Sequence, residues 1–405
     1  MKNKGGYRDI PTEIPFMASN MVNRRLESEV GGAMNQKRVR DFGIVPGRIK
    51  TGKGNKITDV PGVLVGHTTI KNQDNHTGVT VILPGKENAF TKKYVAASYV
   101  HNGFGKSCGL IQIDELGTLE TPIALTNTLN VGVVWDALAE YVIRQCEKDQ
   151  VPVKSLNPVV GECNDSQINH IEKRGVRAEH VWDAIACAKE DFAEGDVGAG
   201  AGTICYGLKG GIGSASRVVE FYGKEYTIGV LVQSNFGATE DFVLNGIPMG
   251  EKILKRKAEW DKRAVENSDK ILAGSMAIAQ SDQGSIMTIL ATDLPVSDRQ
   301  LRRILRRTAV GIARTGAYTG HGSGEVMIGF TTANRVSMEA GEKPVVQSVI
   351  HESMINRAFQ GAAEAAHEAI LNSMVCAERT VGIDGQVYWG LGELLPDLTV
   401  VAGEK

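Results

Sequence analysis

The chain has 405 residues, enough for one large domain or several ordinary ones. Hydrophobic residues make up 42% of it and charged residues 23%, a globular composition that excludes intrinsic disorder. Lys and Arg total 45 against 47 Asp and Glu, so the formal net charge of -2 removes the electrostatic case for a nucleic-acid or anionic-membrane partner.

The first half of the chain predicts mostly strands. Residues 1–37 are polar and lack a pattern, so we expect an N-terminal extension there, followed by a single domain over 38–405. Short β-branched runs broken by turn residues predict strands within 57–70 and 77–84. Apolar residues at helical spacing predict a helix over 136–150.

The second half alternates strands with long helices. Residues 218–237 predict two strands around a Tyr-Gly-Lys turn, and 285–292 and 325–334 predict further strands. A serine N-cap opens a long amphipathic helix over 297–316, and a second helix, rich in small residues, is predicted over 358–375. The strands come in hairpin-like groups without strict β-α-β alternation, which favours a layered α+β sandwich over a doubly wound sheet.

A charged segment at 251–270 predicts a solvated helix. It could instead form a rim or lid over a cleft, or an oligomer contact.

The cysteines and the N-terminus bear on the cellular compartment. Six cysteines are scattered without a CxxC pair, so neither a zinc site nor a disulfide framework is indicated and a reducing compartment fits. The first 20 residues have no apolar core of a secretory signal, and no stretch approaches the roughly 18 apolar residues that span a bilayer. We therefore expect a cytoplasmic protein.

The densest glycine cluster, residues 195–217, suggests a phosphate cradle, because glycine-rich loops point successive N–H groups at anions. The cluster contains no G-x-x-x-x-G-K-[S/T], and it does not follow a clear strand with an acidic residue at the Rossmann distance. We expect a tightly packed loop, or one that lines a substrate cleft.

Two short motifs contain candidate nucleophiles. Gly284-Ser285 opens a predicted strand, where glycine permits the strain of an N→O acyl shift and the freed serine would carry nucleophile and base in one residue. Ser323 and Glu325 are two residues apart at the start of another strand, so their side chains share a face and could polarise a nucleophile. A Ser-His-Asp triad with His321 is conceivable, but there is no G-x-S-x-G elbow. Because no H-E-x-x-H or comparable spacing occurs, we expect no metal.

Seven segments in one order resemble a known family, the self-processing serine aminopeptidases of the L-aminopeptidase/D-esterase and β-peptidyl aminopeptidase type (peptidase family S58). The resemblance extends from Arg38 to about Val401. The segments are ITDVPGVLVGH (57–67), TPIALTNTLNVG (121–132), PVVGECND (158–165), GAGAGTICYGLKGGIGSASR (198–217), LVQSNFG (231–237), GSIMTILATDLP (284–295) and TGAYTGHGSGE (315–325).

The resemblance implies a four-layer αββα sandwich of the N-terminal-nucleophile type. It implies self-cleavage between Gly284 and Ser285 into residues 1–284 and 285–405, which would assemble as a homo-oligomer of processed pairs without a cofactor. Such enzymes remove N-terminal residues, some of them β- or D-amino acids, from short peptides, amides or esters.

The resemblance also implies a role for each site residue. Ser285 would be the nucleophile and its new α-amine the proton acceptor, while Ser323 and Glu325 would orient and polarise it. Asn235 would stabilise the tetrahedral oxyanion, and Glu162 would lie near the free amine of the substrate.

One departure from the family pattern affects the substrate site. The pattern can be Glu-Thr-Tyr-Asp, whereas residues 162–165 of this chain are Glu-Cys-Asn-Asp, so Asn164 replaces a tyrosine that would contact substrate or oxyanion. The closest alternative is an enzyme of the same fold that hydrolyses ω-amino-acid oligomers or transfers acyl groups. A non-catalytic binding protein is the other alternative, and the retained Gly-Ser, Ser and Glu spacing weighs against it.

Overall fold

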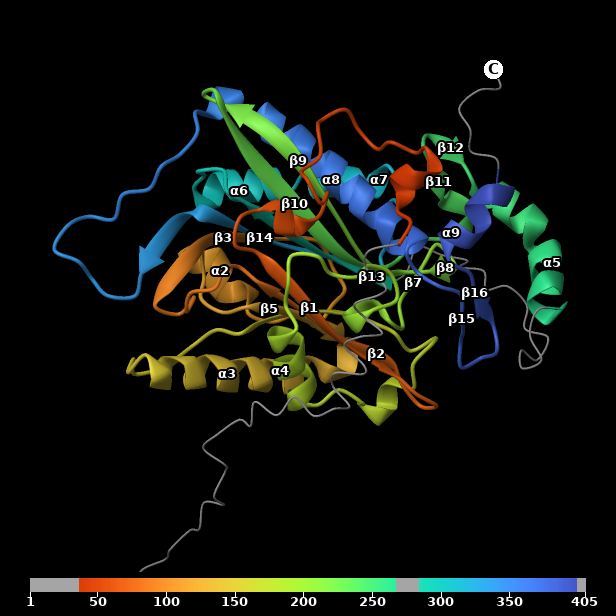
Figure 1. The fold of residues 1–405 in the computed structure, drawn as a ribbon, viewed down its shortest axis with the longest axis horizontal. Coiled ribbons are helices and arrows are strands. Elements are labelled where there is room, and N and C mark those ends of the chain that lie inside the picture. Colours follow the sequence, from red (N-terminus) through yellow and green to blue (C-terminus); the bar gives the residue numbers. More distant parts are fainter. Residues whose placement is uncertain (1–35, 267–283, 399–405) are drawn as a thin grey trace, which may run out of the picture. The chain divides into compact units, whose positions relative to one another are not determined.

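Two β-sheets form the middle of the described fold in the computed structural model, which describes residues 36–266 and 284–398 (Figure 1). The smaller sheet has the order β1-β2-β5-β6, with β1 (Leu64–Lys71), β2 (His76–Leu83), β5 (Ile123–Asn127) and β6 (Val159–Cys163). The larger sheet has the order β4-β3-β14-β13-β10-β9, with β4 (Thr118–Leu119), β3 (Lys92–Gly103), β14 (Ser323–Ser337), β13 (Gly284–Thr292), β10 (Lys224–Asn235) and β9 (Gly211–Phe221).

The two sheets pack face to face. Side chains from both sheets share one buried apolar cluster, among them Val65 and Ile82 from the smaller sheet and Ile289 and Ile328 from the larger one. After Gly284, every residue of β13 is buried, which explains why this central strand is an almost continuous apolar run in the sequence.

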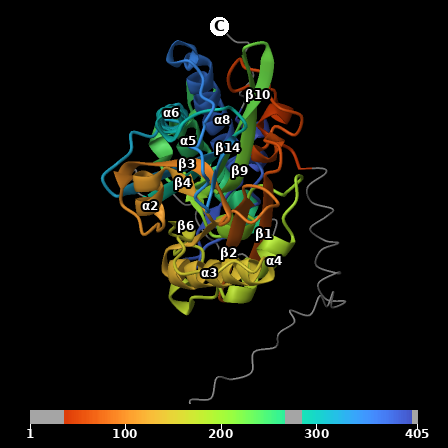
Figure 2. The same cartoon turned by 90° about the vertical axis from the view of Figure 1, so that its left-hand side faces the viewer.

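Helices cover the outer face of each sheet. Helices α3 (Val131–Lys148) and α4 (Ala178–Ala186) share a buried cluster with the smaller sheet, whereas α6 (Asp298–Leu305), α7 (Thr308–Ala313) and α8 (Asn356–Val375) share one with the larger sheet. In two perpendicular views α3 and α4 lie below the strands and α6 and α8 above them (Figures 1 and 2). The remaining α-helices are α2 (Leu110–Leu116), α5 (Gly250–Glu266) and α9 (Leu391–Leu394). None of the described helices is long and apolar enough to span a membrane.

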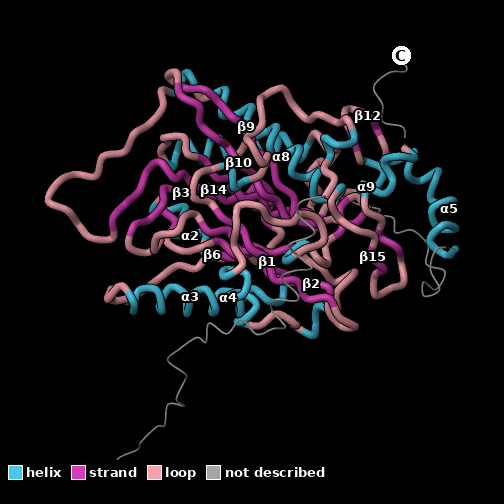
Figure 3. The backbone as a smooth tube through the Cα atoms, in the orientation of Figure 1, coloured by secondary structure: helices cyan, strands magenta, loops and turns pink. Residues whose placement is uncertain are grey.

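Short hairpins and loops complete the described residues. The hairpins pair β7 (Ile204–Cys205) with β8 (Leu208–Lys209), β11 (Val243–Leu244) with β12 (Ile247–Pro248), and β15 (Thr380–Val381) with β16 (Val387–Tyr388). A long loop between β14 and α8 extends away from the sheets (Figure 3).

Several predicted elements are confirmed. Strands β2, β13 and β14 and helices α3 and α8 lie where the sequence predicts them, and β9 and β10 flank the turn at Tyr222 and Gly223. In the predicted strand 57–70, however, only the part from Leu64 onward is a strand, because 57–59 forms a 3-10 turn.

The long helix predicted over 297–316 was wrong in its length. It begins as predicted, since the Ser297 hydroxyl accepts a hydrogen bond from the Gln300 N–H at 3.2 Å. It then breaks between α6 and α7, where the Thr308 hydroxyl donates to the Leu305 carbonyl at 2.7 Å. Such a side-chain bond competes with the helical bonding pattern, and α7 then packs separately on α8.

The solvated helix predicted in the charged segment 251–270 is confirmed as a helix in its described part, but only one side of that helix is exposed. Helix α5 covers its described part, while residues 267–270 and almost all of the predicted extension 1–37 lie outside the described residues. Ile253 and Trp260 of α5 are fully buried in the core that contains α8. The Trp260 indole N–H also donates to Asp397 at 3.3 Å, so one side of α5 belongs to the core.

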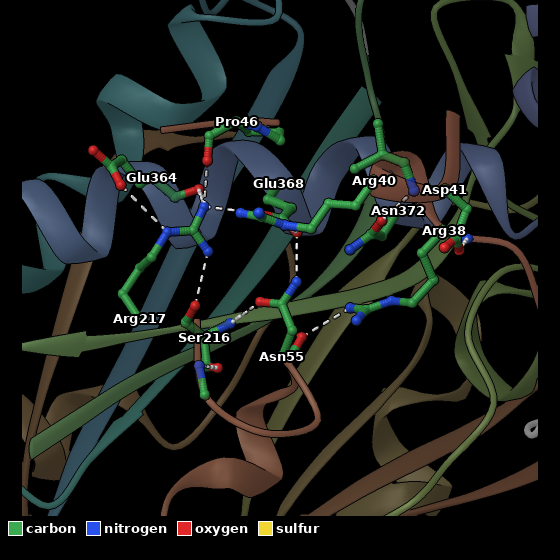
Figure 4. A network of polar contacts seen from close by, with 12 residues as sticks. Arg38, Arg40, Asp41, Pro46, Asn55, Ser216, Arg217, Glu364, Glu368 and Asn372 are labelled. Atoms are coloured by element: carbon green, nitrogen blue, oxygen red, sulfur yellow. Dashed lines mark hydrogen bonds and ion pairs between the residues drawn. The ribbon is translucent and has the colours of Figure 1, made fainter. Parts of the chain in front are cut away.

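A buried ionic network joins the N-terminal segment, β9 and α8 (Figure 4). The Arg217 guanidinium, fully buried on β9, contacts Glu364 at 3.3 Å and Glu368 at 2.7 Å. Glu368 also accepts hydrogen bonds from Arg40 Nε at 2.6 Å and from Asn55 Nδ2 at 2.5 Å. Because buried charges are stable only when paired, this network ties the three segments together.

Candidate active site

Ser285 lies at the start of the central strand β13, between β10 and β14. Its register partners are Asn235 on β10 and Gly324 on β14. Gly284 has φ +127°, and a Cβ there would lie 2.0 Å from the Asn235 carbonyl oxygen. Only glycine fits this position, which supplies a structural reason for the Gly-Ser pair.

Ser323 and Glu325 lie beside the Gly284–Ser285 peptide. They are buried on β14, and the Ser323 hydroxyl donates a hydrogen bond to the Glu325 carboxylate. Ser323 pairs with Gly284, and Glu325 pairs with the residue after Ser285. Since neighbouring residues in a strand face opposite sides, the Ser323–Glu325 pair lies on the face opposite the Ser285 side chain. The pair thus flanks the backbone at the proposed cleavage site rather than the Ser285 hydroxyl.

The Asn235 carboxamide has a defined orientation. Its Oδ1 accepts a hydrogen bond from the Ile204 N–H at 3.0 Å. A backbone N–H can only donate, so the opposite end of the carboxamide must be the Nδ2 group. Asn235 lines the same cavity as Ser285, where an Nδ2 group could donate to a developing oxyanion.

Glu162 provides a carboxylate in the wall of this cavity. It is only 4% exposed, yet it lines the cavity at the end of β6. One oxygen accepts from the Lys106 N–H at 2.7 Å and the other from the Thr128 hydroxyl. These two hydrogen bonds hold the carboxylate in place.

Asn164 and Cys163 follow Glu162 directly. Asn164 is exposed and lines the cavity, with its Oδ1 accepting from the Ser166 N–H at 2.9 Å. The Cys163 thiol is buried between β6 and β10, donating to the Gln233 carbonyl at 3.5 Å. Burial raises the pKa of this thiol well above its usual range, so it stays protonated.

The cavity encloses about 590 Å³, and Ser285, Asn235, Glu162 and Asn164 all line it. The structure thus brings together four of the predicted site residues around one space, with Ser323 and Glu325 buried beside them rather than lining it. His321 is exposed, its ring facing Phe104 at 6.5 Å, and it does not line this cavity.

Sequence reasoning missed several residues that line the cavity. Phe104 and Lys106 follow β3, and Asp384, Gln386 and Tyr388 come from the β15–β16 hairpin near the end of the chain. No motif or periodicity marks them, because only the tertiary fold brings them together. Of the two alternatives expected for the glycine cluster 195–217, a tightly packed loop or one that lines a cleft, the second applies to Gly202, Ile204, Tyr206 and Gly207, which line this cavity.

Comparisons with known proteins identify the family of the chain. The model of peptidase family S58 matches residues 55–388. The chain is 35% identical over 392 residues to beta-peptidyl aminopeptidase BapA of Sphingosinicella xenopeptidilytica, covering 93% of each chain. A solved beta-aminopeptidase of Burkholderia sp. is 36% identical with a TM-score of 0.78, over 91% of this chain and 100% of that one.

A second solved structure defines the type of fold. The L-aminopeptidase D-Ala-esterase/amidase of Ochrobactrum anthropi, described as a new variant among the Ntn hydrolase fold, is 31% identical with a TM-score of 0.77. The match covers 89% of this chain and 97% of that one. The chain is therefore a mixed α and β protein of the Ntn-hydrolase kind, and it belongs to peptidase family S58.

Proposed function

We propose that the chain is a self-processing serine aminopeptidase acting through an acyl-enzyme on Ser285. The observation that carries the proposal is the convergence of Ser285, Asn235 and Glu162 on one cavity. A nucleophile, an oxyanion donor and an acceptor for an ammonium group are the three parts that an aminopeptidase of this kind requires.

We also infer the finer architecture. Helices α3 and α4 on one sheet and α6 to α8 on the other support a four-layer αββα sandwich, preceded by the extension 1–37. Self-cleavage would divide the domain into 1–284 and 285–405. Assembly of the processed pairs into a homo-oligomer and a cytoplasmic location stay predictions.

Self-cleavage would use the hydroxyl of Ser285. Its Oγ attacks the Gly284 carbonyl carbon, the Gly284–Ser285 C–N bond breaks, and the proton lost from Oγ passes to the Ser285 nitrogen, which becomes the α-amine. Water then hydrolyses the resulting ester, which releases the Gly284 carboxylate and restores the hydroxyl. The left-handed φ of Gly284 and the adjacent Ser323–Glu325 pair support this step.

Substrate turnover would reuse the same groups. Ser285 Oγ attacks the substrate carbonyl, its α-amine accepts the proton, and Asn235 Nδ2 donates to the oxyanion. The α-amine then returns the proton to the leaving amine. In the second half, water attacks the acyl-enzyme carbonyl, the α-amine accepts the proton of the water, and Ser285 Oγ takes that proton as it leaves. Glu162 would bind the ammonium group of the substrate, which restricts cleavage to the N-terminal residue.

The named relatives support short peptides, amides or esters as substrates. Two of them are β-aminopeptidases by name, and another is an L-aminopeptidase and D-Ala-esterase. We propose that N-terminal β- or D-residues also fit this cavity. Asn164 is shorter than the tyrosine of the family pattern, so it leaves space beside Glu162.

The role of Glu162 can be tested with Glu162→Gln. We expect kcat/KM for substrates with a free amine to fall about tenfold to hundredfold, since a hydrogen bond to a charged group contributes about 1.5–3 kcal/mol. Esters without an amine should lose much less. Asp384→Asn is the matched control, because it removes a second carboxylate from the same cavity. Equal losses on both kinds of substrate would remove the amine-binding role of Glu162.

A further inference from the structure

Lys209 is a fully buried cation that the proposed reaction does not use. It lies on β8, and its ammonium group donates to the carbonyl oxygens of Gly200 at 2.9 Å, Thr203 at 2.8 Å and Gly210 at 2.8 Å. A protonated lysine has three donors, and all three are used here. Lys209 therefore fixes the glycine-rich loop from inside at three points.

One of these carbonyls belongs to the peptide that holds Asn235. The Thr203 C=O accepts from Lys209, and the Ile204 N–H of the same peptide unit donates to Asn235 Oδ1 at 3.0 Å. A cation on the oxygen of an amide polarises the amide and strengthens its N–H as a donor. The charge of Lys209 is thus linked to the carboxamide of Asn235 through a single peptide.

We propose that Lys209 is a positioning residue for the oxyanion donor. Its ammonium holds the Thr203–Ile204 peptide so that the Ile204 N–H keeps Asn235 Nδ2 directed at the cavity beside Ser285. The inference rests on the role of Asn235 in the proposed function.

A buried ammonium is a costly way to hold a loop. Lysine is almost never fully buried unless its charge is paired, because removal from water disfavours the charged form. The nearby side chain of Gln233 shows that a neutral group can hold this loop, since its Nε2 donates to the Ala199 carbonyl at 2.8 Å and to the Thr126 carbonyl at 3.1 Å. The positive charge of Lys209 needs a reason beyond packing, and support of an oxyanion donor supplies one.

The charged groups around Lys209 set its titration. Burial lowers its pKa to about 7, Asp196 raises it, Lys71 lowers it, and Asp165 and Cys205 raise it. The ammonium form, with three donors for three carbonyls, therefore predominates below about pH 7, and kinetic comparisons are best made at about pH 6.5.

The test is a double-mutant cycle between Lys209→Gln and Asn235→Ala, with kcat normalised to the cleaved fraction determined by mass spectrometry. Lys209→Gln keeps two N–H donors but removes the charge. We expect it to lower kcat at least about tenfold, up to the 10²–10³-fold that complete loss of an oxyanion donor typically costs, while KM changes less than about twofold. In the Asn235→Ala background the same substitution should change kcat less than about twofold, since the group it positions is gone.

Gln233→Met is the matched control, because it releases the same loop at another carbonyl without touching the Thr203–Ile204 peptide. Its effect on kcat should be equal in both backgrounds. An equal loss from Lys209→Gln in both backgrounds, or failure of Lys209→Gln to fold while Gln233→Met folds, would assign Lys209 a purely structural role and overturn the proposal. Wild-type kcat in Asn235→Ala alone would instead refute the oxyanion role of Asn235, a separate result.

Discussion

Replacement of Glu368 by alanine should destabilise the protein more than loss of any surface charge. This carboxylate is fully buried and accepts hydrogen bonds from Arg40, Asn55 and Arg217. Its removal leaves the Arg217 guanidinium buried with Glu364 as its remaining carboxylate, at 3.3 Å. Breaking a buried ion pair in this way costs about 3–5 kcal/mol of unfolding free energy.

The control is Glu352→Ala, which also removes a carboxylate bound by two arginines. Glu352 contacts Arg299 and Arg303, but its side chain is 39% exposed. Solvent screens such exposed pairs and they contribute little, so the free energy of unfolding of this variant should stay close to that of the wild type. The assay is urea denaturation followed by circular dichroism. Equal losses of stability in Glu368→Ala and Glu352→Ala would refute the reasoning.

The contribution of Glu368 to the free energy of unfolding should depend on pH in one direction, which follows from its pKa. Burial alone would raise the pKa of Glu368, but the hydrogen bond from Arg40 and the attraction of Arg217 outweigh burial and lower the pKa below its usual value. The carboxylate therefore stabilises the fold fully above the unfolded-state pKa of about 4.3, and this contribution is lost as pH falls through the lower folded pKa. The difference in free energy of unfolding between wild type and Glu368→Ala should be constant above about pH 5 and should decrease only at acid pH. A difference that widens on acidification would contradict this assignment.

Two further predictions concern the oxyanion donor and a buried histidine. Asn235→Ala should lower kcat about 10²–10³-fold with a much smaller change in KM, because one oxyanion donor contributes about 2.7–4 kcal/mol, and a kcat within tenfold of wild type would count against this role. Burial lowers the pKa of His67 to about 4, with its ring between the Thr80 hydroxyl at 2.9 Å and the Ala193 carbonyl at 3.1 Å. The unfolded chain then binds more protons than the folded chain between about pH 6.5 and 4. The free energy of unfolding should therefore decrease as the pH is lowered across that window. His67→Gln should flatten this slope in urea titrations, and an unchanged slope would show that His67 does not cause it.

The sequence predicted best those parts of the fold that local patterns determine. The hairpin of β9 and β10 follows from its β-branched runs and from the turn at Tyr222 and Gly223, both of which are local signals. The break between α6 and α7 could not be predicted, because it depends on the hydrogen bond from the Thr308 hydroxyl to the Leu305 carbonyl and on the packing of α7 against α8. The burial of Trp260 was also missed, because the segment around it is mostly charged and its few apolar residues are recognised as core residues only from the tertiary structure.

In the candidate site too, the sequence predicted the residues that lie in local motifs and missed a residue whose contacts arise only from the tertiary fold. Gly284, Ser285, Asn235 and Glu162 lie in motifs, and strand register brings the first three together on adjacent strands. Lys209 could not be recognised, because its function depends on three backbone carbonyls whose positions no residue pattern encodes.

The most direct test of the central claim is a denaturing mass spectrum of the purified wild-type protein beside Ser285→Ala. The full chain has a mass of 43.5 kDa. Cleavage before Ser285 predicts chains of about 30 kDa for residues 1–284 and about 13 kDa for 285–405, as expected for an N-terminal nucleophile. Ser285→Ala should give one uncleaved, folded and inactive chain. Cleavage of that variant at the same bond, or an active wild type that stays at 43.5 kDa, would contradict the account.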